Sequence, residues 1–536
     1  RLTDVTGVQT CALPISMMYR RSFLGSAAAG LAPLNAAPAP AGASVGVQET
    51  LPLNGVWRFR AEGQKEFRKV EVPHTWQVDQ DLTEHYGPAV YERQFDVPAS
   101  WRGKAVRIEF EAVFHSARVS VNGKPAGDHL RKGYTAFWLD VAGLLTYGAR
   151  NTIRVDVTNA FDEEMLPRGR SSDWAHDGGI YRPVWLHMTP RTFVERVEID
   201  AEPGAQGGPA PVTAKVIVSG GDANTKLSWR IVEDDGGWIA AEGSGPASAG
   251  ITARIEQPLL WHFDHPHLYR LEIEIDSGHR FSETFGIKKF EVRNRAFYLN
   301  GEKVKLMGVE RMAGSNPSYG MAEPREWLDH DHADMRELNC VYTRVHWPQD
   351  KRTLDYCDRH GIMIQTEVPT WGPRTFAGMK DEPSPALMNN GLEQLREMVA
   401  RDRNHPSICS WGACNEIGGQ NPPAYKFAKR VYDEAKKLDP KRLVTYASHS
   451  LTKTPENDVS REMDYVMWNQ YYESWNGGTQ ADLARNIDAI GRAFPGKAIV
   501  VSEYGYCACT LERPEGDSKK GRCSILTCWL PSLPAR

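Results

Sequence analysis

Hydrophobic and polar residues alternate in short runs through the first half of the chain, between residues 51 and 287. A period of two residues is typical of strands buried on one face, and turn residues separate the runs. Asn122 and Gly123 stand between two such runs, which predicts a type I′ hairpin turn. We expect two antiparallel β-sandwiches, at residues 47–190 and 191–288, the second with the size of an immunoglobulin-like domain. The main runs span residues 56–60, 106–111, 117–122, 151–158, 212–218, 225–232, 251–256 and 269–275.

The pattern changes after residue 297, where short apolar strands alternate with amphipathic helices. Seven strand–helix repeats predict a (β/α)8 barrel within residues 289–536. A doubly wound sheet is the alternative, and it is disfavoured because no glycine-rich phosphate loop follows the first strand. The expected strands span residues 304–309, 340–346, 361–367, 407–415, 442–447, 464–469 and 498–503, with helices near 325–338, 350–360, 386–403, 423–437 and 480–494.

The charge and the aromatic content of the chain indicate which kinds of ligand the protein binds. The net charge of -4 argues against a nucleic acid as the ligand. Beyond the N-terminus, no run approaches the roughly 18 apolar residues of a membrane span. The chain contains 16 Trp and 19 Tyr, whose rings can stack on the apolar face of a sugar, although β-sandwich cores also use aromatic residues.

The N-terminal region has the composition of an export signal. Arg20 and Arg21 precede a short apolar run at 25–34, and an Ala- and Pro-rich stretch follows. This order is typical of a twin-arginine signal, which would send the protein to the periplasm or the medium. The signal would begin at Met17 or Met18, so residues 1–16 are expected to take no part in the fold. Residues 1–46 are therefore excluded from the domain assignment.

Polar residues lie at the ends of the predicted barrel strands, where active sites of this fold are found. Glu416 follows the fourth strand and Glu503 ends the seventh, while His346 and Asn469 end two others. Two carboxyl groups at one barrel mouth suit glycoside cleavage, because one can protonate the leaving oxygen while the other attacks the anomeric carbon. A single Glu at such a place often only caps the next helix. Polar residues at most of the seven strand ends favour an active site.

Three segments carry a family resemblance. Residues 401–416, RDRNHPSICSWGACNE, and residues 499–505, IVVSEYG, resemble the acid/base and nucleophile segments of glycoside hydrolase family 2, which contains β-galactosidases, β-glucuronidases and β-mannosidases. Residues 173–185, DWAHDGGIYRPVW, resemble the sugar-contacting loop of the family's first domain. The resemblance implies a jelly-roll sugar-binding domain, an immunoglobulin-like domain and a TIM barrel. It also implies an exo-acting enzyme that hydrolyses terminal β-linked sugars with retention of configuration.

The resemblance assigns a role to each matching residue. Glu416 matches the acid/base, Glu503 the nucleophile, and Asn415 the Asn that hydrogen-bonds the sugar 2-hydroxyl. The other matches are substrate-binding residues or residues that flank the nucleophile: Asp173, His346, Asn469 and Tyr471. No metal or other cofactor is assigned. A magnesium or sodium ion has no support, because Glu367, which lies where large β-galactosidases bind magnesium, fits a structural hydrogen-bonding role better.

The sequence also departs from the family. Glu310, Arg311 and Met312 replace the more usual Asn-Arg-His after the first strand. Arg344 stands two residues before His346, where the family has an Arg at three. Only 536 − 503 = 33 residues follow the last predicted strand, and they lack a strand–helix pattern. The barrel is therefore expected to be truncated before its eighth strand.

The predicted function is that of a retaining exo-β-glycosidase acting on a carbohydrate substrate. β-Galactosidase is favoured as the commonest activity on this architecture. The alternatives are β-glucuronidase, β-mannosidase and an inactive, truncated carbohydrate-binding fragment. A homo-oligomer is compatible with the sequence.

Overall fold

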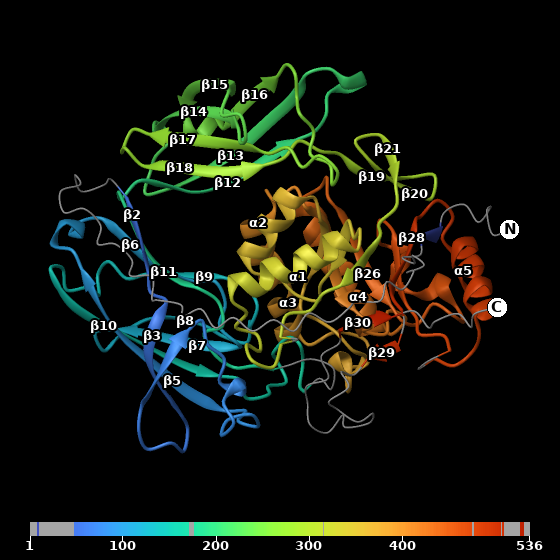
Figure 1. Cartoon of the computed structure of the whole chain (residues 1–536), viewed down its shortest axis with the longest axis horizontal. Helices are drawn as coiled ribbons and strands as arrows, with labels where there is room; N and C mark the ends of the chain where they lie inside the picture. The colour runs from blue at the N-terminus through green and yellow to red at the C-terminus, as the bar shows by residue number, and fades with distance from the viewer. Residues whose placement is uncertain are drawn as a thin grey trace, which may run out of the picture.

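The computed structural model describes residues 8–9, 48–170, 176–314, 316–473, 476–504, 506–508 and 526–529. Two β-sandwiches, blue and green in Figure 1, flank a barrel coloured yellow to red. The expected architecture of two N-terminal sandwiches followed by a barrel is therefore confirmed. No helix in the described ranges is long and apolar enough to cross a bilayer. The predicted twin-arginine signal lies outside the described residues.

The first sandwich packs a six-stranded sheet, in the order β4-β3-β5-β10-β7-β8, on a four-stranded sheet, β2-β11-β6-β9. Its core contains Trp57, Phe59 and Phe110, which come from alternating positions of their strands. Asn122 and Gly123 have φ angles of 52° and 76°, as a type I′ turn requires. The strands are β2 (Glu49–Pro52), β3 (Gly55–Ala61), β4 (Arg68–Val72), β5 (Pro88–Val97), β6 (Ala105–Phe110), β7 (Ser116–Val121), β8 (Lys124–His129), β9 (Phe137–Asp140), β10 (Ala149–Thr158) and β11 (Val184–Thr189).

The second sandwich packs a three-stranded sheet, β12-β13-β16, on a four-stranded sheet, β15-β14-β17-β18. Alternating residues such as Ile231 and Leu271 fill the space between them. Arg359 of the barrel forms an ion pair with Asp234 at 2.7 Å, so this sandwich rests on the barrel near α2 (Figure 1). The strands are β12 (Phe193–Ala201), β13 (Ala210–Ser219), β14 (Lys226–Glu233), β15 (Ile239–Pro246), β16 (Ile251–Ile255), β17 (Tyr269–Ile275) and β18 (Arg280–Phe285).

A small antiparallel sheet joins the second sandwich to the barrel. It consists of β19 (Phe290–Arg293), β20 (Ala296–Leu299) and β21 (Glu302–Val304). The prediction of the first barrel strand at 304–309 was therefore wrong at its start. Asn300 and Gly301 make a tight turn with φ angles of 54° and 89°, and the residues after it pair back onto β20. The barrel strand begins only at Gly308.

Seven parallel strands, β22 to β28, follow one another in chain order around the barrel, and helices connect most of them. The strands are β22 (Gly308–Glu310), β23 (Tyr342–Arg344), β24 (Met363–Glu367), β25 (Ile408–Asn415), β26 (Leu443–Ser448), β27 (Val466–Asn469) and β28 (Ile499–Glu503). The helices are α1 (Arg325–Glu337), α2 (Lys351–His360), α3 (Pro385–Asp402), α4 (Pro422–Leu438) and α5 (Gln480–Ala493). All five agree with the predicted helices to within two residues.

Sequence explains where the helices begin. The Asp350 side chain accepts from the Arg352 N–H at the start of α2, and Thr479 with Asp482 forms a capping box at the start of α5. Single 3-10 turns lie at Trp76–Val78 (η1), Ala99–Trp101 (η2), Ala205–Gly207 (η3), Ala247–Ala249 (η4), Pro373–Phe376 (η5), Pro455–Asn457 (η6) and Val459–Arg461 (η7).

Three further short strands lie outside the seven barrel strands. β1 (Val8–Gln9) pairs in parallel with β28, although residues 1–16 were expected to take no part in the fold. The edge of β28 offers unpaired backbone groups, which a passing strand can satisfy. After β28 the described segments are β29 (Tyr506–Ala508) and β30 (Leu526–Trp529), which pair with each other as an antiparallel ribbon. An eighth parallel strand after Glu503 is not found among the described residues.

Candidate active site

Glu416 stands directly after β25, in a sharp turn of the backbone. Its φ of 51° lies in the left-handed region, which a non-glycine residue adopts at a cost of about 1 kcal/mol. The Glu416 N–H donates to Ala447 O at 2.8 Å, which fixes the turn against the neighbouring strand β26. Its side chain accepts a hydrogen bond from Asn469 Nδ2 at 3.0 Å. The turn therefore directs the carboxyl group towards the end of β27.

Glu503 ends β28 and is held by two donors. Arg344 Nη1 donates to Glu503 Oε1 at 2.6 Å, and the Tyr471 hydroxyl donates to Oε2 at 2.5 Å. His346 Nε2 lies 3.7 Å from the same Oε1. Both oxygens thus have a charged or polar donor, which fixes the orientation of the carboxyl group.

Arg344 is the centre of the hydrogen-bond network. Its side chain is 1% exposed, and Nη2 donates to Glu367 Oε1 and to Asn415 Oδ1, both at 2.9 Å. Glu310 Oε1 lies 3.3 Å from Nη1. A planar guanidinium can serve several acceptors at once from one buried position, which a lysine cannot. Arg344 therefore ties the end of its own strand, β23, to the ends of four others.

Glu310, the last residue of β22, lies beside His346. The imidazole Nδ1 is 3.0 Å from Glu310 Oε1 and 3.0 Å from Glu367 Oε1. Burial, followed by the negative charge of Glu503, raises the pKa of Glu310 to about 8. Burial acts to lower the pKa of His346, but Glu310 and Glu367 together outweigh burial, so the pKa of the imidazole is raised. Glu310 and His346 therefore each have a raised pKa in the folded protein.

Glu367 has a structural environment. It accepts hydrogen bonds from Arg344 and from Gln365 Nε2 at 3.0 Å, and it is 1% exposed. Burial would raise the pKa of Glu367, but the Arg344 charge brings it below its ordinary value. These contacts agree with a hydrogen-bonding role. Glu310, His346 and Glu503 could bring three metal-ligand atoms together, yet Arg344 pairs with both carboxyl groups and would repel a dication there.

Glu416 differs from Glu503 in its surroundings. Burial raises the pKa of Glu416, and the charge of Glu503 raises it further, while the hydrogen bond from Asn469 opposes both. No cation pairs with Glu416 among the described residues. The two carboxyl groups therefore differ in their surroundings: burial and a neighbouring charge raise the pKa of Glu416, whereas Arg344 and Tyr471 donate to the two oxygens of Glu503.

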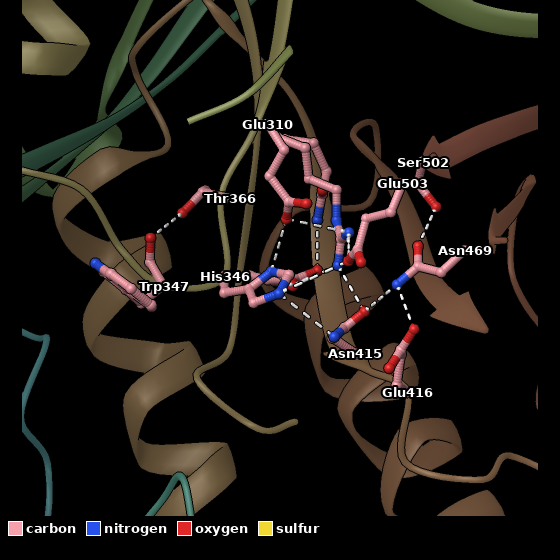
Figure 2. Close-up of polar contacts among 12 residues, drawn as sticks. Glu310, His346, Trp347, Thr366, Asn415, Glu416, Asn469, Ser502 and Glu503 are labelled. Carbon is pink, nitrogen blue, oxygen red and sulfur yellow. Dashed lines mark hydrogen bonds and ion pairs between the residues drawn. The ribbon is translucent and has the colours of Figure 1, made fainter. Parts of the chain in front are cut away.

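The asparagines link the two carboxyl groups. Asn469 Nδ2 donates to Asn415 Oδ1 at 2.9 Å as well as to Glu416, and its Oδ1 accepts from Ser502 Oγ at 2.7 Å. Figure 2 shows Asn415 between His346 and Asn469, with Glu416 and Glu503 on either side of Asn469. Six of the seven predicted site residues, Glu416, Glu503, His346, Asn415, Asn469 and Tyr471, are thus connected within one network. Asp173, the seventh, lies outside the described residues.

The first sandwich approaches the barrel mouth next to these residues. Arg182 Nη2 donates to Pro348 O at 2.7 Å, and Tyr134 stacks on Trp347 with ring centroids 4.9 Å apart. Pro348 and Trp347 directly follow His346. The sandwich loop that contains the described end of the 173–185 segment therefore supports the site from outside the barrel.

Sequence reasoning did not assign Glu310 and Arg344 to the site. They were noted only as departures from a motif, yet both contact Glu503 or His346. Two signals were present in the sequence. Arg344 and His346 are two residues apart, so a strand places them on one face. Glu310 ends the neighbouring strand, where it pairs in register with Arg344.

Three family models match consecutive parts of the chain. They are described as "Glycosyl hydrolases family 2, sugar binding domain" over residues 35–190, "Glycosyl hydrolases family 2" over 187–288, and "Glycosyl hydrolases family 2, TIM barrel domain" over 290–511.

Individual proteins match as well. A "Beta-glucuronidase" of Bacteroides fragilis is 30% identical over 490 residues, covering 85% of this chain and 68% of the relative. A "Beta-galactosidase" of Thermoanaerobacter pseudethanolicus is 30% identical over 412 residues, covering 73% of this chain and 53% of the relative. The solved β-D-glucuronidase of Dictyoglomus thermophilum superposes with a TM-score of 0.80 at 23% identity, covering 88% of this chain and 85% of that one. At this identity the superposition supports the fold alone.

Proposed function

The chain belongs to glycoside hydrolase family 2, and from this membership we propose a retaining, exo-acting β-glycosidase with Glu416 as acid/base and Glu503 as nucleophile. The supporting observation is the contrast between the two carboxyl groups. Burial and the Glu503 charge raise the pKa of Glu416, whereas Arg344 and Tyr471 bind both oxygens of Glu503. One acid and one carboxylate at the same barrel mouth are what double displacement requires.

In the first step, Glu416 donates its proton to the glycosidic oxygen while a Glu503 oxygen attacks the anomeric carbon. The bond between that carbon and the leaving oxygen breaks, and the aglycone departs as an alcohol. The sugar is now an ester of Glu503. In the second step, Glu416 takes a proton from water as the water oxygen attacks the anomeric carbon. The ester breaks, Glu503 regains its negative charge, and the sugar leaves with its original anomeric configuration.

The coupling between the two residues assists the exchange of roles. Formation of the ester removes the negative charge of Glu503, which is one of the causes that raise the pKa of Glu416. The pKa of Glu416 therefore falls in the intermediate, when a base is needed, and rises again when Glu503 is released. Asn469 donates to Glu416 throughout and keeps its carboxyl group oriented.

We further propose that Asn415 binds the sugar 2-hydroxyl, and that Asp173 and His346 take part in substrate binding. Asn415 fits this role because Arg344 and Asn469 both donate to its Oδ1, which leaves the amide end of the side chain directed towards His346. A group fixed in this way loses little entropy when the sugar arrives.

The proposed sugar is a β-glucuronide, with a β-galactoside as the second candidate. Relatives named "Beta-glucuronidase" from Bacteroides fragilis and Paenibacillus borealis are each matched over 85% of this chain, at 30% and 26% identity. The relative named "Beta-galactosidase" is 30% identical over 73% of the chain. It supports β-galactosidase, the activity favoured from the sequence, as the second candidate.

The test uses p-nitrophenyl β-glucuronide, β-galactoside and β-mannoside with the full chain, and proton NMR of the product in the first minutes. We expect the β-anomer of the released sugar to appear first, with the highest kcat/KM on the glucuronide. Initial release of the α-anomer would refute the double displacement. A higher kcat/KM on the galactoside would refute the sugar assignment and leave the mechanism standing.

A further inference from the structure

A cavity of about 80 Å³ lies where the second sandwich meets the barrel. Its walls come from the end of β12, from the connection after β18, and from the turns that precede β25 and β26. Glu416 and Glu503 follow the opposite ends of the barrel strands. The cavity is therefore at the other pole of the barrel from the proposed active site, and catalysis does not account for its composition.

The wall of this cavity carries more positive than negative groups. Three cations have a carboxylate partner on the same wall: Arg403 with Asp200 at 3.4 Å, Arg442 with Asp439 at 3.1 Å, and Lys441 with Glu202 at 3.7 Å. Lys288 is the fourth cation of the wall. Among the described residues no carboxylate forms an ion pair with it.

Lys288 is a partly buried amine with few hydrogen-bond partners. Its Nζ donates to Ile408 O at 2.8 Å and lies 5.4 Å from the centre of the Trp261 ring. An ammonium has three N–H donors, and one backbone carbonyl satisfies one of them. Burial, with a smaller contribution from the Arg442 charge, lowers the pKa of Lys288 to about 7. A negative ligand in the cavity would supply both the missing charge and the missing acceptors.

We propose that this cavity is a binding site for a small inorganic oxyanion of the size of sulfate or phosphate, with Lys288 as its principal ligand. Arg403 and Arg442 line the same space; Arg403 Nε makes no hydrogen bond in the structure, while Arg442 Nη1 is paired with Asp439. The bound anion would bridge the connection after the second sandwich to the start of β25. It would therefore stabilise the junction between the two domains.

The first experiment measures Tm against sulfate concentration at constant ionic strength, with sodium chloride as the balancing salt. The wild type should show a saturable rise in Tm that chloride does not produce. Lys288→Met keeps an unbranched apolar chain over Trp261 but removes the charge. It should weaken the apparent sulfate affinity at least about tenfold, the size of one lost charge-assisted hydrogen bond.

Lys497→Met is the matched control. Lys497 is also a partly buried amine, but it donates to the backbone carbonyls of Ser460, Arg461 and Met463 and does not line the cavity. Its sulfate affinity should equal that of the wild type. Unsaturable sulfate dependence in the wild type, or equal sulfate affinity in Lys288→Met, would overturn the proposal.

A second measurement needs no variant, in case Lys288→Met does not fold. The wild type is acetylated briefly with acetic anhydride, with sulfate or with chloride, and the modified lysines are quantified by mass spectrometry. Sulfate should lower the acetylation of Lys288 at least severalfold and leave that of Lys497 unchanged. Equal acetylation of Lys288 in the two salts would also overturn the proposal.

Discussion

Glu310 should make the protein lose stability as the pH rises, and Glu310→Gln should remove this effect. The Glu310 side chain is 18% exposed, and its Oε1 lies 3.0 Å from His346 Nδ1 and 3.3 Å from Arg344 Nη1. Burial and the Glu503 charge raise the pKa of Glu310 to about 8 in the folded protein. In the unfolded chain an ordinary Glu pKa of about 4.5 applies. Between these two values the folded state holds a proton that the unfolded state has released.

The magnitude follows from linkage. A group whose pKa is raised on folding contributes stability that is complete below the unfolded pKa and is lost as the pH rises through the folded pKa. For a difference of about 3.5 units, at 1.36 kcal/mol per unit, the loss is about 5 kcal/mol by pH 8. Gln cannot ionise, so the variant should gain stability relative to the wild type by up to this amount as the pH rises from 4.5 to 8.5.

The assay compares Tm for the wild type and Glu310→Gln at half-unit steps from pH 5 to pH 9. At about 2–4 °C per kcal/mol, the variant should exceed the wild type by about 10–20 °C at pH 8.5, with the gap closing towards pH 5. Glu302→Gln, which removes a carboxylate whose side chain is 74% exposed, is the control and should show no pH-dependent gap. A gap that is constant with pH, or that widens towards low pH, would refute the protonated state of Glu310.

Three substitutions test other parts of the network. Glu416→Ala should slow the cleavage of substrates with poor leaving groups most, because an activated aryl leaving group needs little protonation. Steady-state rates are measured on a series of leaving groups, and an equal loss of rate for every substrate would contradict the acid role. Tyr471→Phe removes the 2.5 Å hydrogen bond to Glu503 and should lower kcat/KM about 10-fold with little change in Tm, whereas unchanged kinetics would exclude a role for the hydroxyl. Arg344→Lys keeps the charge but cannot serve Glu503, Glu367 and Asn415 together, so kcat/KM should fall about 100-fold; a near-wild-type value would show that the charge alone suffices.

Most of the fold could be predicted from the sequence because its elements have clear periods. The change from a period of two to alternating strands and helices located the sandwiches and the barrel. The first barrel strand was misplaced because the largely apolar run that begins at Val304 resembles a barrel strand, but Val304 itself pairs with Phe297 of β20 after the Asn300–Gly301 turn. The hydrophobic pattern alone does not show whether such a run pairs with β20 or with the barrel strand β23.

The sequence predicts those site residues whose position depends only on the end of their own strand. Glu416, Glu503, His346 and Asn469 follow from the rule that active sites of this fold lie at the carboxyl ends of the strands. Glu310 and Arg344 are defined instead by contacts between strands, since the pair is adjacent only through the register of β22 and β23. The pKa of Glu310 is raised by burial and by the charge of Glu503, which is distant in sequence. Such interactions become visible only when the strands are assembled.

The central claim is that Glu503 forms a covalent bond to the sugar and that Glu416 assists its release. The most direct measurement is intact-protein mass spectrometry of Glu416→Ala mixed with an activated aryl β-glycoside, followed by peptide mapping. An activated leaving group departs without an acid, whereas hydrolysis of the ester needs the missing base, so the intermediate should accumulate. The account predicts a mass increase of one glycosyl residue located on Glu503. A variant that turns over without an adduct, or an adduct on any other residue, would contradict it.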